Sequence, residues 1–305
     1  MRIAIVGSGA LGLYYGSLLQ RGGHEVHFLL RRDYYAIMTG GLTVHSINGD
    51  FHLPSVSGHI TSESIGVVEL VIVALKTFAN NGLFNLIKPL LDSGTTILTL
   101  QNGLGNEEQL AALFGAECVL GGVAFLCSNR GEPGHVHHLA AGRVAIGAFV
   151  CNESSPLEDI VSVFTSSGIE CRATGDLKKT RWEKLVWNIP FNGLSALLQK
   201  SVDMLLKPFG CRKLVRDLMI EVIQAANSQH LSSVIPETYV DTMLEFTDGM
   251  GVYKPSMQID REEGRELELQ AIFRTPLESG RQQGVSMPRV EMLVILLEQG
   301  SAEMS

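Results

Sequence analysis

The sequence predicts an α/β protein in which a doubly wound sheet is followed by an all-helical domain. Two observations support this fold class. In the first half of the chain, short β-rich runs alternate with segments of helical periodicity, which is typical of a parallel sheet with crossover helices. From about residue 176 only helical periodicity continues, with Gly or Pro at the breaks. We therefore expect one domain over residues 1–175 and a second over residues 176–305.

The elements of the first domain follow from local patterns. Residues 70–75 are almost all apolar, as expected of a strand buried on both faces. Asn48-Gly49 is a strong turn signal, so residues 42–45 and 51–56 should form a hairpin. Further strands are predicted at residues 2–6, 25–30, 96–100, 119–126, 135–140, 143–147 and 169–172, and helices at 10–21, 106–114 and 156–167.

The second domain should contain helices at residues 178–200, 211–230, 236–246, 261–283 and 288–299. The chain of 305 residues is long enough for both domains to bury a core. Its formal net charge of −8 argues against nucleic-acid binding, which usually needs a basic face.

Cysteine usage and hydropathy restrict the class further. The cysteines at positions 118, 127, 151, 171 and 211 are scattered without a C-x-x-C pair, which indicates reduced thiols rather than a disulfide framework or a zinc site. The N-terminus does not have the pattern of a signal peptide, and no run of about 18 apolar residues occurs. We therefore expect a soluble cytoplasmic protein with neither a membrane nor a nucleic-acid partner.

A glycine-rich turn follows the first predicted strand. Gly7, Gly9 and Gly12 have the G-x-G-x-x-G spacing, and the turn opens a helix within a β-α-β unit. Such glycines let the backbone approach a pyrophosphate, whose charge meets the N-terminus of the helix. An ordinary glycine-rich turn is the alternative. We predict a Rossmann-type dinucleotide site whose cofactor-binding residues here are Gly7, Ser8, Gly9, Ala10, Leu11 and Gly12.

The residues after the second strand discriminate between nicotinamide cofactors. NAD enzymes place Asp or Glu about 20 residues beyond the motif to bind the ribose hydroxyls. This chain has Arg31 and Arg32 at that point, with Asp33 just after them. A guanidinium suits a 2′-phosphate in charge and in the geometry of its donors. A solvated arginine pair is the alternative, and Asp33 leaves room for NAD, but the pattern favours NADPH/NADP+.

Polar residues also follow two other buried strands. Lys76 comes just beyond residues 70–75, and Gln101, Asn102 and Gly103 come just beyond residues 96–100. Ligands of open α/β sheets bind at the carboxyl ends of the strands. Either residue set alone could serve solubility, but two such loops together favour a functional site.

The first helix of the second domain carries a file of polar side chains. Lys184, Asn188 and Asn192 recur at every fourth position, so they lie nearly above one another beside an apolar face. Pro190 falls between the asparagines and leaves the carbonyl of Val186 without its helical donor, which predicts a kink. The file is either a solvated surface or the wall of a cleft.

Other candidate residues carry weaker signals. Ser256 precedes a predicted helix that carries Glu268 among other acids, which are mostly expected on a solvated face, and spacing alone does not single out Glu268. The histidines at 135, 137 and 138 lack a carboxylate or cysteine at ligand spacing, so we expect edge-strand histidines and no metal site. No serine or cysteine shows the pattern of a nucleophile.

The ordered set of motifs resembles the ketopantoate reductases (2-dehydropantoate 2-reductases) over essentially the whole chain. The resemblance rests on IAIVGSGALG, the arginine at 31, the VALK and QNG loops, the KL-x-x-N-x-x-x-N helix and the SM-x-x-D-x-x-x-GR-x-x-E segment. It implies an NADPH enzyme that reduces a small 2-keto acid, ketopantoate, to pantoate on the route to pantothenate.

The resemblance also implies residue roles. Lys184 would be the general acid, and Glu268 would match the family's active-site glutamate. Asn188 and Asn192 would belong to the substrate network, and Ser256 would bind substrate. On this interpretation the polar file faces an interdomain cleft, opposite the cofactor.

Lys76 and Asn102 would be cofactor-side residues near the nicotinamide by the same resemblance. The nearest alternative is a related NAD(P)-dependent reductase that acts on another 2-keto acid or a 3-hydroxy acid. A nucleotide sensor without catalysis is a second alternative, but a sensor needs no proton donor such as Lys184. The sequence is also compatible with a homodimer, because helical second domains often pair through apolar faces.

Overall fold

The computed structural model describes residues 1–150 and 155–302 of the chain. These residues form two compact units. The first comprises residues 1–101 and 106–177, and the second comprises the loop at 102–105 together with the chain from residue 178 onward. The loop therefore groups with the second unit, although the residues on either side of it in the chain belong to the first.

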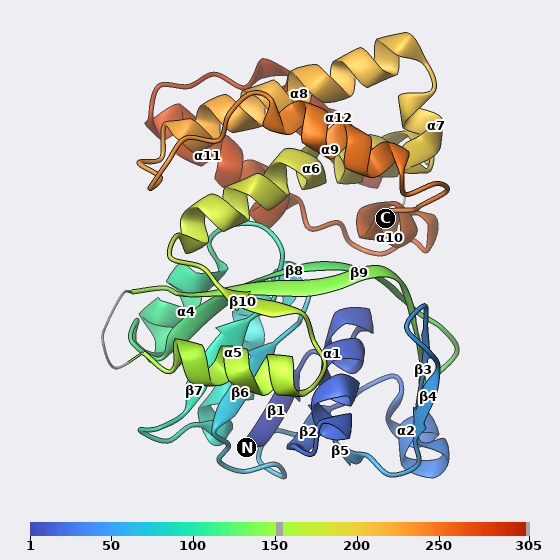
Figure 1. The fold of residues 1–305 in the computed structure, drawn as a ribbon, viewed down its shortest axis with the longest axis vertical. Coiled ribbons are helices and arrows are strands. Elements are labelled where there is room, and N and C mark those ends of the chain that lie inside the picture. The colour runs from blue at the N-terminus through green and yellow to red at the C-terminus, as the bar shows by residue number, and fades with distance from the viewer. Residues whose placement is uncertain (151–154, 303–305) are drawn as a thin grey trace. The chain divides into compact units, whose positions relative to one another are not determined.

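The first unit is built on a sheet with ten strands among the described residues. The strands are β1 (Arg2–Val6), β2 (Glu25–Leu29), β3 (Leu42–Ser46), β4 (Phe51–Leu53), β5 (Ser57–His59), β6 (Leu70–Val73), β7 (Thr96–Thr99), β8 (Val119–Arg130), β9 (His135–Ala148) and β10 (Cys171–Ala173). Their order is β4-β3-β9-β8-β7-β6-β1-β2-β5, and β10 pairs with β9 (Figure 1). The strands from β8 to β5 pair in parallel, whereas β8 with β9 and β3 with β4 are antiparallel.

Helices cover both faces of this sheet. They are α1 (Ala10–Arg21), α2 (Tyr34–Gly40), α3 (Leu83–Ile87), α4 (Asn106–Phe114) and α5 (Leu157–Ser166), with 3-10 turns η1 (Thr77–Gly82) and η2 (Lys88–Leu90) around α3. In β1, Ile3 and Ile5 pack in the core with α1 and α5, whereas Ala4 and Val6 pack in the core with α3 and α4. Both faces of β1 are therefore buried, and the predicted doubly wound α/β class is confirmed.

Strand β9 differs from the sequence prediction. Residues 135–140 and 143–147 were expected as two strands, but they form one continuous strand. Ala141 and Gly142 have φ values of 60° and 119°, and the pairing with β8 shifts register beside them. This bulge bends the strand without ending it, and α1 packs against β1, β2, β3, β8 and β9. The sheet therefore curls around α1.

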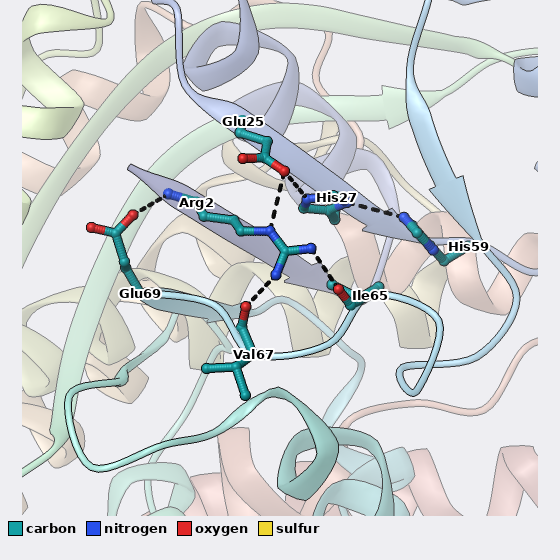
Figure 2. Close-up of polar contacts among 7 residues, drawn as sticks. All are labelled: Arg2, Glu25, His27, His59, Ile65, Val67 and Glu69. Carbon is teal, nitrogen blue, oxygen red and sulfur yellow. Dashed lines mark hydrogen bonds and ion pairs between the residues drawn. The ribbon is translucent and has the colours of Figure 1, made fainter.

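Arg2 ties together the amino ends of the parallel strands (Figure 2). Its main-chain N–H donates to Glu69 Oε2 at 2.5 Å, and its Nε donates to Glu25 Oε1 at 3.1 Å. The guanidinium also donates to the carbonyl of Ile65 at 2.6 Å and to that of Val67. These contacts join the chain before β6 to β1 and β2 at the end of the sheet opposite the carboxyl ends of the strands.

The same network extends to the edge strand β5. Glu25 Oε1 lies 2.9 Å from His27 Nε2, and His27 Nδ1 lies 3.0 Å from His59 Nε2 (Figure 2). A hydrogen-bonded chain of one carboxylate and two imidazoles therefore supports the pairing of β2 with β5.

The second unit is helical throughout its regular structure. Its helices are α6 (Leu177–Leu198), α7 (Val202–Leu206), α8 (Phe209–Asn227), α9 (Tyr239–Asp248), α10 (Ser256–Glu262), α11 (Thr275–Gln282) and α12 (Pro288–Ala302), with a π-helical turn η3 (Gln270–Arg274) before α11. Trp182, Leu185, Val186 and Ile189 of α6 are fully buried in its core. The helix continues through Pro190, and the kink expected there stays a prediction.

The single helix predicted at residues 261–283 is wrong. Helix α10 ends in a Schellman motif: Gly264 has φ 66°, its N–H donates to the carbonyl of Arg261 at 3.1 Å, and Arg265 N–H donates to the carbonyl of Asp260 at 2.7 Å. An irregular segment then leads to η3 and α11. A glycine in left-handed conformation thus ends α10 inside the segment for which helical periodicity predicted one continuous helix.

No helix among the described residues is both long enough and apolar enough to cross a membrane. The cysteines within the described ranges, at 118, 127, 171 and 211, are free thiols. Cys151 lies outside the described residues.

Candidate functional site

The turn after β1 is packed so closely that side chains are excluded from two of its positions. Gly7 has φ 109°, and a Cβ there would lie 2.3 Å from the amide nitrogen of Leu75, beyond β6. A Cβ on Gly12 would lie 2.1 Å from the carbonyl oxygen of Gly7. Both distances are far shorter than a van der Waals contact, so the turn requires glycine at these positions.

The third glycine of the motif has open space instead. A Cβ on Gly9 would meet nothing within 4 Å. Gly9 is the N-cap of α1, and the first turn of this helix, which begins at Ala10, has no acidic residue. Ser8 Oγ donates to the carbonyl of Leu29 at 2.9 Å and so ties the turn to the end of β2. Unpaired N–H groups of a helix N-terminus beside open space form an anion site that fits a pyrophosphate.

The end of β2 carries one buried acid and two exposed bases. The side chains of Arg31 and Arg32 are exposed, whereas Asp33 is 2% exposed at the start of α2. The carboxylate of Asp33 accepts a hydrogen bond from Arg130 Nη2 at the end of β8. Asp33, the acid that kept NAD as an alternative in the sequence analysis, is therefore already hydrogen-bonded within the protein.

The loops after β6 and β7 are joined by an amide network. Gln101 Nε2 donates to the carbonyl of Leu75 at 3.0 Å and to Asn80 Oδ1 at 2.7 Å. Asn80 Nδ2 in turn donates to Asn106 Oδ1 at 3.2 Å. Gln101 is buried and connects the two loops, whereas Lys76 is half-buried at the start of η1.

The loop at 102–105 brings Asn102 to the polar file of α6. Lys184 Nζ donates to Asn102 Oδ1 at 2.6 Å. Leu104 N–H donates to the carbonyl of Ala271 at 2.9 Å, and Gly103 has φ 85° with no room for a Cβ beside Ala271. The loop is therefore held against η3, and its Asn102 contacts the Lys184 ammonium.

The rest of the polar file is buried. Asn188 and Asn192 are 5% and 3% exposed, so neither belongs to a solvated surface. Met257 N–H, in the first turn of α10, donates to Asn192 Oδ1 at 3.4 Å. Ser256 is the adjacent residue and is half-buried, so the start of α10 lies beside the file.

Burial separates Glu268 from the other acids of its segment. Glu262, Glu263 and Glu266 are exposed, as the sequence predicted, whereas Glu268 is 3% exposed. Glu268 is not on the helix that Ser256 begins, because α10 ends at Glu262. Its carbonyl instead accepts from Ile272 N–H at 3.3 Å, at the start of η3. Glu268 thus belongs to the same turn that supports the loop at 102–105.

The histidines of β9 do not lie on an edge strand, because β9 pairs with β3 on one side and β8 on the other. His135 and His137 stack on His45 of β3, with ring centroids 5.3 and 4.7 Å away. His138 is buried and lies 3.1 Å from the Tyr14 hydroxyl. Among the described residues, no group of three or more His, Cys, Asp or Glu is arranged to hold a metal ion.

Two interactions could not be anticipated from the sequence. Arg130 and Asp33 are separated by 97 residues, and no pattern links them. The carbonyl of Ala271 holds the loop at 102–105 through backbone geometry, for which the glycine at position 103 was the only visible signal.

Known proteins resemble this chain along almost its whole length. A family model described as "Ketopantoate reductase PanE/ApbA" matches residues 3–150, and the model of its C-terminal part matches residues 176–301. A 2-dehydropantoate 2-reductase from Nostoc sp. is 40% identical over 297 residues, which cover 96% of this chain and 92% of that protein.

Solved structures give the same result. A 2-dehydropantoate 2-reductase from Geobacter metallireducens has a TM-score of 0.97 and 64% identity, covering 98% of this chain and 99% of that one. A D-mandelate dehydrogenase solved with NADH and anilino(oxo)acetate has a TM-score of 0.90 at 21% identity, covering 100% of this chain and 99% of that one, which shows a shared fold. The resemblance inferred from the sequence motifs is thus confirmed, and the chain belongs to the ketopantoate reductase family of oxidoreductases.

Proposed function

We propose that this protein reduces 2-dehydropantoate (ketopantoate) to pantoate with NADPH, a step in the biosynthesis of pantothenate. The contact between Lys184 Nζ and Asn102 Oδ1, at 2.6 Å, is the observation that carries the mechanism. It holds a primary ammonium against Asn102, on a helix whose next two turns carry the buried carboxamides of Asn188 and Asn192, in a chain that belongs to the ketopantoate reductases. A sensor protein would need no such proton donor.

NADPH supplies the hydride when it is bound. Residues 7–12 bind the pyrophosphate through the N-terminus of α1, and the space beside Gly9 accommodates it. Arg31 or Arg32 contacts the 2′-phosphate, because both guanidinium groups are exposed at the end of β2. Lys76 lies beyond β6, on the cofactor side. On this proposal residues 1–175 form the cofactor domain and residues 176–305 the catalytic domain.

Lys184 acts as the general acid. As C2 of the keto acid is reduced, negative charge develops on its carbonyl oxygen, and an ammonium within hydrogen-bond reach stabilises this charge and donates the proton. Asn102 accepts one hydrogen of the ammonium and thereby directs the others. The proton lost to the product is replaced from water, so one keto group, one hydride and one proton become one hydroxyl group.

The substrate is held by neutral donors and one acid. Asn188 and Asn192 offer carboxamides, and Ser256 offers a hydroxyl at the start of α10, so they can bind the carboxylate and hydroxyl of the substrate without adding charge. Glu268 is the second catalytic group: its buried carboxylate accepts a hydrogen bond from the substrate hydroxyl and restricts the orientation of the keto group.

A substrate panel tests this proposal. Initial rates of NADPH oxidation would be measured with ketopantoate, 2-oxoisovalerate, pyruvate and 2-oxo-2-phenylacetate, and repeated with NADH. We expect ketopantoate to have the highest kcat/KM by at least about tenfold, because the site's buried polar groups pair with its hydroxyl. If another keto acid is preferred, the reductase chemistry stands and the substrate assignment is wrong.

We also propose that the protein forms a homodimer. Met292, Ile295 and Leu296 share one face of α12 and are exposed by about half, and a second copy of the chain would cover them. Light scattering of the purified protein would test this. A monomer at micromolar concentration, or a dimer unaffected by Leu296→Glu, would contradict it.

A further inference from the structure

Asp33 and Arg130 form a partly buried ion pair beside the proposed 2′-phosphate site. Arg130 Nη2 donates to Asp33 Oδ2, and the side chain of Asp33 is only 3% exposed, while that of Arg130 is 30% exposed. The second carboxylate oxygen, Asp33 Oδ1, is buried and has no hydrogen-bond partner within the described residues. Asp33 is therefore held by a single cation, which the end of β8 supplies.

The position of Asp33 gives this pair a functional meaning. An acid at the end of the second strand of this fold binds the ribose hydroxyls of NAD and repels the additional phosphate of NADP. Here the acid directly follows two exposed arginines. The positive charge of the Arg130 guanidinium offsets the negative charge of Asp33. Arg31 and Arg32 therefore determine the net charge at this end of β2.

We propose that Arg130 is a specificity-determining residue, which favours NADP over NAD by holding Asp33 in an ion pair away from the ribose. Arg130 acts through Asp33 and is a positioning residue. The inference rests on the proposed use of NADPH. It predicts that the loss of Arg130 weakens the binding of NADP, which carries the 2′-phosphate, and leaves the binding of NAD nearly unchanged.

A purely structural role of the same pair predicts something different. The pair joins the end of β8 to the start of α2, so its loss could loosen this region and weaken both cofactors equally. NADP+ and NAD+ differ only in the 2′-phosphate, so the ratio of their affinities separates an electrostatic effect from a general loss of structure.

The test is a double-mutant cycle measured by calorimetric binding of NADP+ and NAD+. The variants are Arg130→Met, which keeps most of the side-chain volume, Asp33→Asn, which keeps the shape and removes the charge, and the double variant. Arg130→Lys is the matched control, because it preserves the positive charge. Thermal unfolding and circular dichroism would establish that each variant is folded.

We expect Arg130→Met to weaken NADP+ binding by about tenfold or more, with NAD+ changed by less than about threefold, because a carboxylate without its counter-charge repels the phosphate. Adding Asp33→Asn should return NADP+ affinity to within about threefold of the wild type. Equal losses for both cofactors, an unchanged ratio, or no rescue by Asp33→Asn would overturn the inference. If the wild type prefers NAD+, the proposed cofactor is wrong. The change in the ratio of NADP+ to NAD+ affinity on Arg130→Met would still test the role of Arg130.

Discussion

Gly103→Ala tests whether the loop at 102–105 must be held against η3 for activity. The backbone of Gly103 has φ 85°, a conformation that costs other residues energy, and a Cβ added there would lie 2.3 Å from the carbonyl oxygen of Ala271. The added methyl group therefore meets a backbone atom rather than a flexible side chain. The loop can accept it only by moving away from Ala271, and Asn102 would move with it.

The size of the effect follows from these contacts. A left-handed conformation costs a non-glycine residue about 1–2 kcal/mol. Moving the loop also breaks the hydrogen bond from Leu104 N–H to Ala271, worth about 1 kcal/mol. We therefore expect the free energy of unfolding to fall by about 2–3 kcal/mol. Because Asn102 then no longer directs the Lys184 ammonium, kcat/KM should fall by about a hundredfold.

Gly105→Ala is the matched control for this experiment. Gly105 also has a positive φ, 91°, but its nearest neighbour to an added Cβ is Thr275 Cγ2 at 3.8 Å. This variant introduces similar backbone strain without the collision. Steady-state kinetics and urea unfolding of both variants would separate the two effects. If Gly103→Ala and Gly105→Ala lose the same activity, the account of how the loop positions Asn102 is wrong.

Two further predictions concern stability. Glu221 is buried and accepts hydrogen bonds from the N–H groups of Arg289 and Val290 at the start of α12, so Glu221→Gln should lower the free energy of unfolding by about 1–3 kcal/mol in urea titrations. Glu291→Gln, which breaks the exposed ion pair of Glu291 with Arg281, should lower it by less than about 1 kcal/mol, and equal effects of the two substitutions would contradict this prediction. Burial and the neighbouring His27 and Arg2 lower the pKa of His59, so the unfolded chain takes up this proton first as the pH falls. Unfolding free energy should therefore decline below about pH 6.5, with a shallower decline in His59→Gln, and parallel curves for the two proteins between about pH 7 and 5 would refute the assignment.

Local patterns were sufficient to predict most of the fold. The strands of the first unit have buried apolar runs or clear turn signals, and the bounds of β1, α1 and α4 agree with the prediction. Strand β5 and the short helices α2, α3 and α7 were not predicted at all. Two other failures occurred where one backbone conformation decides the outcome. Gly142 permits a bulge that keeps β9 continuous, and Gly264 ends α10 within an apparently helical segment. A glycine indicates that such a conformation is available, but only the surrounding packing decides whether it is used.

Local patterns likewise predicted only part of the candidate site. The file of Lys184, Asn188 and Asn192 could be found because helical spacing aligns side chains on one face. The burial of Glu268 could not, since its exposed neighbours are equally acidic and burial depends on contacts distant in sequence. The engagement of Asp33 by Arg130 likewise depends on the sheet bringing together residues 97 positions apart.

The central claim is that Lys184 is the general acid, and turnover of Lys184→Ala at saturating NADPH and ketopantoate tests it most directly. Lys184→Arg keeps the charge but cannot readily give up a proton. Lys179→Ala is the control, because Lys179 lies on the same helix and contacts Ser233 and Glu183. We predict that kcat falls by about a hundred- to ten-thousandfold in both Lys184 variants, with unchanged affinity for NADPH and normal activity of Lys179→Ala. A Lys184→Ala enzyme that retains more than about a tenth of wild-type kcat would contradict the account.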